Sequence, residues 1–151
     1  MRWFGSARGS FAGHKWRVVA IDHDGEKTLV PMRYHVFLQF AKNGDFGAND
    51  SVNFHSGTYR LVSGGFAISK LRRTLVGYDG EDPVILLAAA AISAFSRGVD
   101  AAAAVTGDRL EVAVGGYLLD CQRDGKYSEV PLRDPTSAGR RAQPPGGLTG
   151  R

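Results

Sequence analysis

The chain has 151 residues, 43% of them hydrophobic, which fits a single soluble domain with one core. Its net charge of +4 comes from its two ends. Residues 1–17 carry four basic side chains and no acid, residues 133–151 carry four arginines and one aspartate, and the part between them has more acids than bases. Because a nucleic-acid-binding domain clusters its cations on a folded face, this distribution argues against specific nucleic-acid binding.

The sequence carries no recognisable targeting segment. The N-terminus is positively charged but lacks the continuous apolar stretch of a secretory signal. The longest apolar run, residues 84–92, is far shorter than the roughly 20 residues that span a bilayer. We therefore expect a cytoplasmic protein if the chain is complete, and an exported one if an N-terminal signal was trimmed.

Composition divides the chain into three parts. Residues 1–15 are small, glycine-bearing and basic, and they are predicted to form a flexible leader. Residues 16–132 alternate apolar runs with glycine-rich turns, which predicts one folded domain. Residues 133–151 are rich in proline, glycine and arginine and poor in apolar side chains, so they are predicted to be a disordered basic tail.

The first half of the domain has the pattern of antiparallel strands. Strands are predicted at residues 16–21, 34–40, 58–62 and 66–71, with 26–33 as an edge strand or a loop. The large apolar side chains of the second strand share one face, which predicts that they point into a core: Tyr34, Val36, Leu38 and Phe40. Residues 42–45 are predicted to form a hairpin turn, and Gly64 and Gly65 give the strongest hairpin signal in the chain.

One helix is predicted between two groups of strands. Asp82 suits the N-cap, Pro83 suits the first helical position, and Gly98 can end the helix. The acids at its start, Asp79, Glu81 and Asp82, are interpreted as serving the cap and the helix dipole rather than a metal ion. The side facing the core is predicted to comprise Ile85, Ala88, Ala89, Ile92 and Phe95.

The second half of the domain reads as another meander. Strands are predicted at residues 99–106, 109–114, 117–122 and 127–130, with a turn at 123–126. The lone cysteine, Cys121, lies in one of these strands and is interpreted as a small buried apolar residue rather than a nucleophile. The sum is an α+β fold: a small antiparallel β-barrel or strongly curled sheet, with one helix inserted between two meanders.

Short motifs along the chain resemble those of the META/HslJ-like domain family. The resemblance lies in residues 16–21, 37–40, 43–46, 51–53, 56–59, Thr74 and 107–112. The Gly-Cys pair of the family's loop is replaced here by Ser51 and Val52, and no cysteine follows Thr74. The resemblance implies a fold with one helix between two meanders. It also implies a role at the cell envelope or under stress, without a common enzymatic chemistry.

Hydrogen-bonding side chains are concentrated in residues 49–78. The candidate ligand-binding residues in this stretch are Asn53, His55, Tyr59 and Arg72. Ser56 and Thr58 accompany them, and Arg72 and Arg73 are expected opposite them across the hairpin. In the functional interpretation these side chains line the mouth of a barrel and hold a small polar or anionic ligand. In the structural interpretation Asn53 closes its loop, His55 is exposed and the arginines are solvated.

No nucleotide-, zinc- or calcium-binding motif occurs, so no cofactor is predicted. The leading hypothesis is a non-enzymatic binding or interaction module for a protein or small molecule. A second hypothesis is an enzyme that uses His55 or His35 with Asp50 or Tyr59. A third is a weak binder of nucleic acid or anionic surfaces through the basic ends of the chain. The sequence specifies neither the ligand nor the oligomeric state.

Overall fold

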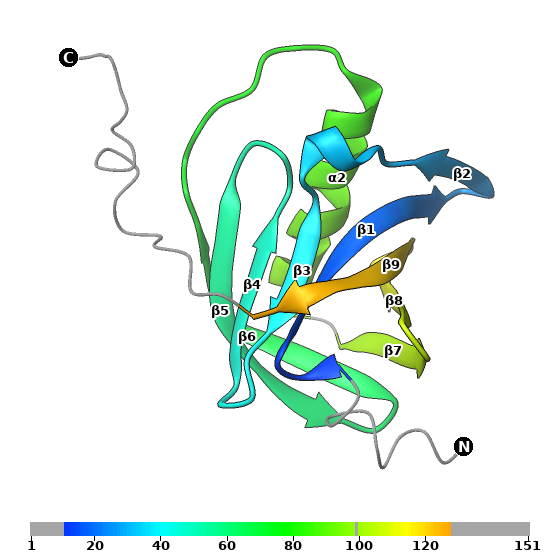
Figure 1. Ribbon diagram of the computed structural model, residues 1–151. Helices are drawn as coiled ribbons and strands as arrows, with labels where there is room; N and C mark the ends of the chain where they lie inside the picture. Colours follow the sequence, from blue (N-terminus) through cyan, green and yellow to red (C-terminus); the bar gives the residue numbers. More distant parts are fainter. Residues whose placement is uncertain (1–10, 99, 128–151) are drawn as a thin grey trace.

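The computed structural model describes residues 11–98 and 100–127, which form a closed antiparallel β-barrel of eight strands with one helix between strands (Figure 1). A further strand, β2, extends one hairpin and pairs with β1. The strands are β1 (His14–His23), β2 (Glu26–Leu29), β3 (Phe37–Phe40), β4 (Asp45–Asn49), β5 (Phe54–Val62), β6 (Gly65–Arg73), β7 (Ala101–Thr106), β8 (Arg109–Val114) and β9 (Tyr117–Lys126). The predicted α+β fold is confirmed, and the sheet closes into a barrel.

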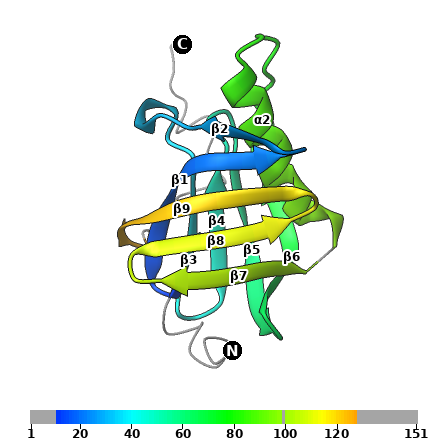
Figure 2. The same cartoon turned by 90° about the vertical axis from the view of Figure 1, so that its right-hand side faces the viewer.

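Strand β1 closes the barrel because it has partners along both of its edges. On one edge its first half pairs with β3 and its second half pairs with β2. On the other edge it pairs with β9 from His14↔Lys126 to His23↔Tyr117, with two register shifts. Figure 2 shows β1, β9, β8 and β7 side by side as one wall of the barrel. Closure of this kind removes the exposed strand edges on which other chains could pair.

Aromatic side chains fill the interior and join all parts of the fold. The ring of Phe40 lies 4.7 Å from that of Phe11 and 5.1 Å from that of Phe66, measured between ring centroids. Phe95, which follows the helix, lies 5.5 Å from Phe46. All five rings are buried, and aromatic pairs at such distances contribute about 0.5–1.5 kcal/mol each beyond their burial. The helix is therefore anchored in the same core as the strands.

The helix α2 (Pro83–Ser93) begins where the sequence predicts and continues as the 3₁₀ segment η2 (Ala94–Arg97). The Asp82 carboxylate accepts a hydrogen bond from the Val84 backbone N–H at 2.9 Å, and Gly98 ends η2 with a φ of 74°. The buried residues are Ala88, Ala91, Ile92, Ala94 and Phe95. Ile85 and Ala89, predicted on the buried face, are only partly buried because the packing uses the C-terminal turns.

The helix runs past the ends of β1, β8 and β9 (Figure 2). At its N-terminal end the Tyr34 hydroxyl donates to the Asp82 carboxylate at 2.7 Å. Tyr34 belongs to the 3₁₀ segment η1 (Met32–Tyr34), so the strand predicted at residues 34–40 is wrong at its start and β3 begins only at Phe37. At its C-terminal end Ala94 lies against Gly115, in the turn between β8 and β9. Within the described residues no helix is long and apolar enough to cross a membrane.

The barrel extends further at both ends than the sequence predicts. Phe11 is fully buried and accepts a hydrogen bond on its carbonyl from the Trp16 indole at 3.1 Å, so residues 11–15 belong to the domain and not to a leader. The turn predicted at residues 123–126 is wrong: β9 continues to Lys126 because it pairs there with β1, across a register shift near Gly125. Predictions for residues 1–10, 128–130 and the tail 133–151 fall outside the described residues.

The seam between the two meanders is narrow and depends on Gly65. Strands β6 and β7 pair only at Gly65↔Ala102 and Phe66↔Ala101 among the described residues. A Cβ atom at Gly65 would collide with the backbone of Ala101, so only glycine allows β7 to approach so closely.

We predict that Gly65→Ala lowers the free energy of unfolding by about 3 kcal/mol, because the strands must separate to admit the methyl group. Gly77→Ala is the matched control, since a Cβ atom there meets nothing within 4 Å. Urea denaturation followed by tryptophan fluorescence measures both variants. Equal stabilities of the two variants would show that the seam does not depend on this glycine.

Candidate functional site

A tight turn between β4 and β5 forms the base of the site. One carboxylate oxygen of Asp50, Oδ1, accepts hydrogen bonds from the backbone N–H groups of Val52 at 2.9 Å and Asn53 at 2.6 Å. The Asp50 N–H in turn donates to the Asn53 carbonyl at 3.0 Å. Ser51 takes a φ of 84°, which few residues other than glycine adopt readily. The aspartate thus holds the turn in a conformation that its sequence alone does not favour.

The other oxygen of Asp50 binds the only buried histidine among the described residues. His55 Nε2 lies 2.8 Å from Asp50 Oδ2, and the two residues are 1% and 2% exposed. Burial raises the pKa of Asp50, but hydrogen bonds from His55, Asn53 and Val52 outweigh it and hold the pKa below its ordinary value. Asp50 is therefore an ionised acceptor, and His55 Nε2 carries the donated proton.

Asn53 fastens the segment that leads from β6 to the helix. Its Oδ1 accepts hydrogen bonds from the Thr74 hydroxyl and the Val76 N–H, both at 2.7 Å, and its Nδ2 donates to the Val76 carbonyl at 2.9 Å. The Thr74 hydroxyl also accepts from the Phe54 N–H at 3.1 Å. The side-chain amide thus pairs with a backbone as a neighbouring strand would. The expectation that Asn53 closes its own loop is wrong, because the Asp50 side chain closes that turn and the Asn53 side chain binds Thr74 and Val76 instead.

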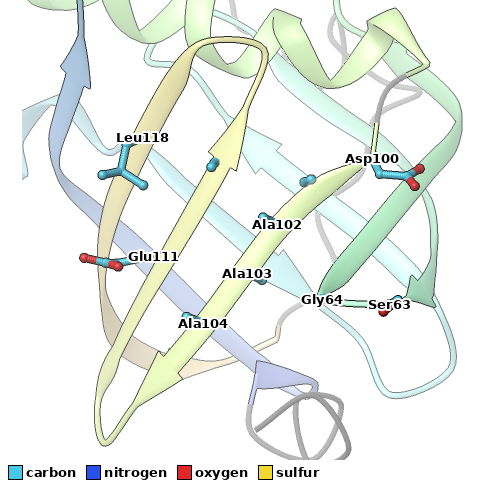
Figure 3. Close-up of a pocket in the computed structure, with 10 residues that line it drawn as sticks. Ser63, Gly64, Asp100, Ala102, Ala103, Ala104, Glu111 and Leu118 are labelled. Atoms are coloured by element: carbon cyan, nitrogen blue, oxygen red, sulfur yellow. The ribbon is translucent and has the colours of Figure 1, made fainter. Parts of the chain in front are cut away.

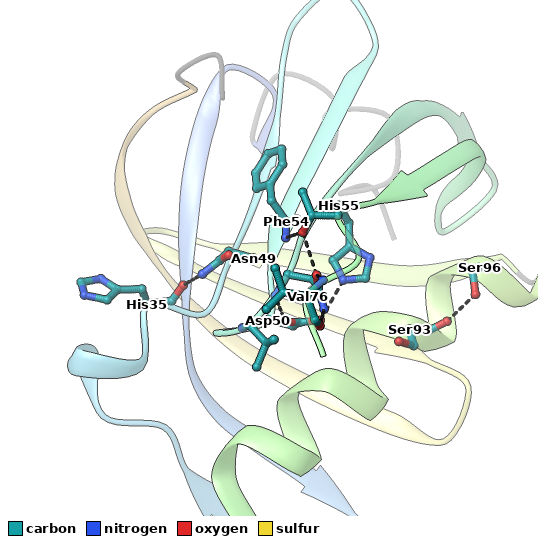
Figure 4. Close-up of polar contacts among 11 residues, drawn as sticks. His35, Asn49, Asp50, Phe54, His55, Val76, Ser93 and Ser96 are labelled. Carbon is teal, nitrogen blue, oxygen red and sulfur yellow. Dashed lines mark hydrogen bonds and ion pairs between the residues drawn. The ribbon is translucent and has the colours of Figure 1, made fainter. Parts of the chain in front are cut away.

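A small pocket lies where β5 and β6 meet the end of the helix. It has a volume of about 90 Å³ and is lined by His55, Leu71, Arg72, Arg73, Ser93 and Ser96. Figure 4 shows the His55 ring reaching from its strand, with Asp50 at one ring nitrogen, and Ser93 and Ser96 on the neighbouring helical segment. The Ser96 hydroxyl donates to the Ser93 carbonyl at 2.7 Å. Polar groups from two strands and the helix therefore converge on one small pocket.

The pocket contains cations and no acid. Arg73 pairs with His55 across the two strands and Arg72 pairs with Ser56, as expected from the hairpin. Paired residues share a face of the sheet, so the Arg73 side chain lies on the face of His55. Both arginines are exposed, and neither forms an ion pair or side-chain hydrogen bond within residues 11–98 and 100–127.

The structure separates the four candidate residues. His55 and Arg72 line the same pocket, whereas the polar atoms of Asn53 are engaged with Thr74 and Val76. The Tyr59 hydroxyl donates to the Ala41 carbonyl at 2.7 Å, and its ring packs on Phe40. Tyr59 lies four residues along β5 from His55, roughly 13 Å away in an extended strand. The expectation that His55 is exposed is wrong, because its side chain is buried. The expectation that Arg72 and Arg73 are exposed to solvent is confirmed.

Sequence reasoning missed the two serines of the pocket. Ser93 and Ser96 are three residues apart, a spacing that places side chains on one side of a helix. The spacing of the two serines can be seen in the sequence. The position of the helix end beside β5 and β6, however, depends on the hydrogen bonds from Asn53 to Thr74 and Val76, here called the Asn53 clamp, and on the burial of Phe95. No local sequence pattern predicts these contacts. Cys121, in contrast, is buried as expected, and burial raises the pKa of its thiol well above its usual range.

A second depression, on the outer face of β7, β8 and β9, is larger than the pocket at His55 but has fewer polar side chains (Figure 3). Its volume is about 430 Å³, and its floor is formed largely by alanines that end at Cβ, Ala102 and Ala113 among them. Asp100 and Glu111 supply its acidic groups. A binding site combines an enclosed surface with convergent polar groups, so we place the candidate site at His55.

Comparison with known proteins identifies the fold alone. No protein-family model matches the chain, and no curated protein matches it. An NMR structure of a protein from Burkholderia xenovorans is similar over 79% of this chain and 87% of that one, with a TM-score of 0.61 and 16% identity. A second NMR structure is similar over 76% of this chain and 92% of that one, with a TM-score of 0.56 and 14% identity.

We predict that Asn53→Ala lowers the free energy of unfolding by about 3 kcal/mol. The substitution removes a buried side chain that donates one hydrogen bond and accepts two. Asn43→Ala, which removes a single bond to the Asp45 N–H in an exposed turn, is the control and should cost about 1 kcal/mol. Urea denaturation measures both. A smaller effect at position 53 than at position 43 contradicts the clamp.

The lowered pKa of Asp50 also predicts a dependence on pH. A depressed pKa stabilises the fold above the unfolded value of 3.8, and this contribution is lost as the pH falls through the lower folded value. The advantage of the wild type over Asp50→Asn in unfolding free energy should therefore shrink below pH 3.8. Asp79→Asn, at an exposed position, is the control and should follow the wild type. An advantage that is constant with pH rules out this role for Asp50.

Proposed function

We propose that the protein is a non-enzymatic binding module with a META/HslJ-like fold, and that it holds a small ligand in the pocket at His55. The observation that carries this proposal is the convergence of His55, Arg73 and Ser93 on a space of about 90 Å³. Ligand sites are concave and contain a few well-placed polar groups on a rigid support. The closed barrel and the Asn53 clamp supply that support.

The pocket is supported by side chains that do not line it. Asp50 fixes one nitrogen of the His55 ring, and both residues are almost completely buried. A ring held in this way does not lose rotamer freedom when a ligand binds, so the cost of ordering it is met during folding. This favours recognition of a ligand by a preformed site.

The enzyme hypothesis has one observation in its favour, the Asp50–His55 pair. An acid at one nitrogen of a histidine orients the ring and stabilises its charged form during general acid–base catalysis. However, no hydroxyl or thiol within the described residues is hydrogen-bonded to the ring's other nitrogen. A nucleophile of the Ser–His or Cys–His type is activated through such a contact, so we favour binding over nucleophilic catalysis.

A fragment titration followed by ¹H–¹⁵N NMR tests the proposal. Compounds of about five to eight heavy atoms, neutral and charged, should include binders that give saturable shifts at the amides of His55, Arg73 and Ser93, and they should be recovered unchanged. Ser93→Leu should abolish these shifts by filling the pocket. Ser63→Leu, at the exposed turn between β5 and β6, is the control and should preserve them. A library that shifts no pocket amide contradicts the proposal.

A further inference from the structure

We propose that the pocket at His55 binds a tetrahedral oxyanion of the phosphate type, either free or as the head group of a larger molecule. This inference rests on the proposed function and specifies the chemistry of its ligand. Volume, charge and donor geometry support it independently.

The volume limits what the pocket can enclose. A pocket of about 90 Å³ has room for several water molecules or one small polyatomic group. A phosphate group is of this kind. A larger molecule would place its phosphate head group in the pocket and the rest of its atoms outside.

The charge of the lining favours an anion. Arg72 and Arg73 are exposed cations without an acidic partner in the described part of the chain. Both carboxylate oxygens of Asp50, the acid that contacts His55, are engaged, one by the turn and the other by His55 Nε2. Guanidinium groups bind phosphate through paired hydrogen bonds in a fixed plane, which gives both affinity and orientation.

The helix end opposes an anion, but the opposition is the smaller effect. The C-terminus of a helix carries about half a negative charge, and Ser93 and Ser96 lie at that end. Arg73, which lies on the face of His55, brings a full positive charge, which is about twice the opposing charge of the helix end. One exposed carbonyl, that of Ser93, is already covered by the Ser96 hydroxyl.

The remaining groups supply donors of suitable geometry. The Ser93 hydroxyl makes no hydrogen bond within residues 11–98 and 100–127 and lines the pocket. His55 has its Nε2 committed to Asp50, so its Nδ1 is the ring nitrogen left to meet a ligand. Arg73 on β6 and Ser93 at the end of the helix can therefore each provide a donor to a tetrahedral group.

The test is a titration of the whole chain with inorganic phosphate at constant ionic strength and pH, followed by ¹H–¹⁵N NMR. Phosphate should give saturable shifts at His55, Arg73 and Ser93, while chloride at the same ionic strength should not. Arg73→Gln should weaken binding about 10-fold, as expected for loss of a charge-assisted hydrogen bond. Arg60→Gln, an exposed arginine on β5 that does not line the pocket, should bind as the wild type does.

The outcomes separate this inference from the proposed function. Glycerol phosphate that binds more tightly than inorganic phosphate supports a head group, and the reverse order supports the free ion. If neutral fragments shift the pocket amides but phosphate does not, the oxyanion inference fails and the binding function stands. If neither phosphate nor any fragment shifts them, both fail. Equal shifts with chloride, or equal affinity in Arg73→Gln, also overturn the inference.

Discussion

The amide of Asn53 is the interaction on which the candidate site depends. It binds the backbone of Val76 through both its oxygen and its nitrogen, so it fixes the chain at the point where β6 leads toward the helix. The helix then enters at Asp82, which is held in turn by the Tyr34 hydroxyl. With its start fixed there and Phe95 buried against Phe46, the helix has one position against the barrel. The pocket exists because that position brings its last turn beside β5 and β6.

The barrel gives this arrangement its rigidity. Strand β1 closes the sheet by pairing with β9 on one edge and with β2 and β3 on the other. The interior is packed with phenylalanine rings from the strands and the helix, which leaves the polar groups of the site at the rim. Asp50 and His55 are nevertheless almost fully buried, and they are tolerated there because they hydrogen-bond each other and the turn donates two further hydrogen bonds to Asp50. A buried polar network of this kind specifies one geometry because any alternative leaves a group unpaired.

Much of the architecture could be predicted from the sequence, because turns, caps and alternation are local signals. The hairpin at Gly64, the cap at Asp82 and the strands of the second meander all follow from residues close together in the chain. The failures have a common physical cause. Phe11 and residues 123–126 are ordered by pairing and packing with distant parts of the chain. Such contacts cannot be predicted from the local composition of the sequence. The candidate site was found only in part for the same reason. Polar density pointed to Asn53 and His55, but it could not show that Tyr59 faces the core or that Ser93 approaches from the helix.

The state of the His55 ring provides the most direct measurement of the central claim, that a buried acid fixes this ring at the edge of the pocket. A long-range ¹H–¹⁵N spectrum reports the four histidines of the chain together, and the other three are partly or fully exposed. The account predicts that His55 Nε2 carries a slowly exchanging proton bound to Asp50, while the rings of His14, His23 and His35 exchange their protons quickly with water. A His55 ring that exchanges as fast as these three would contradict it.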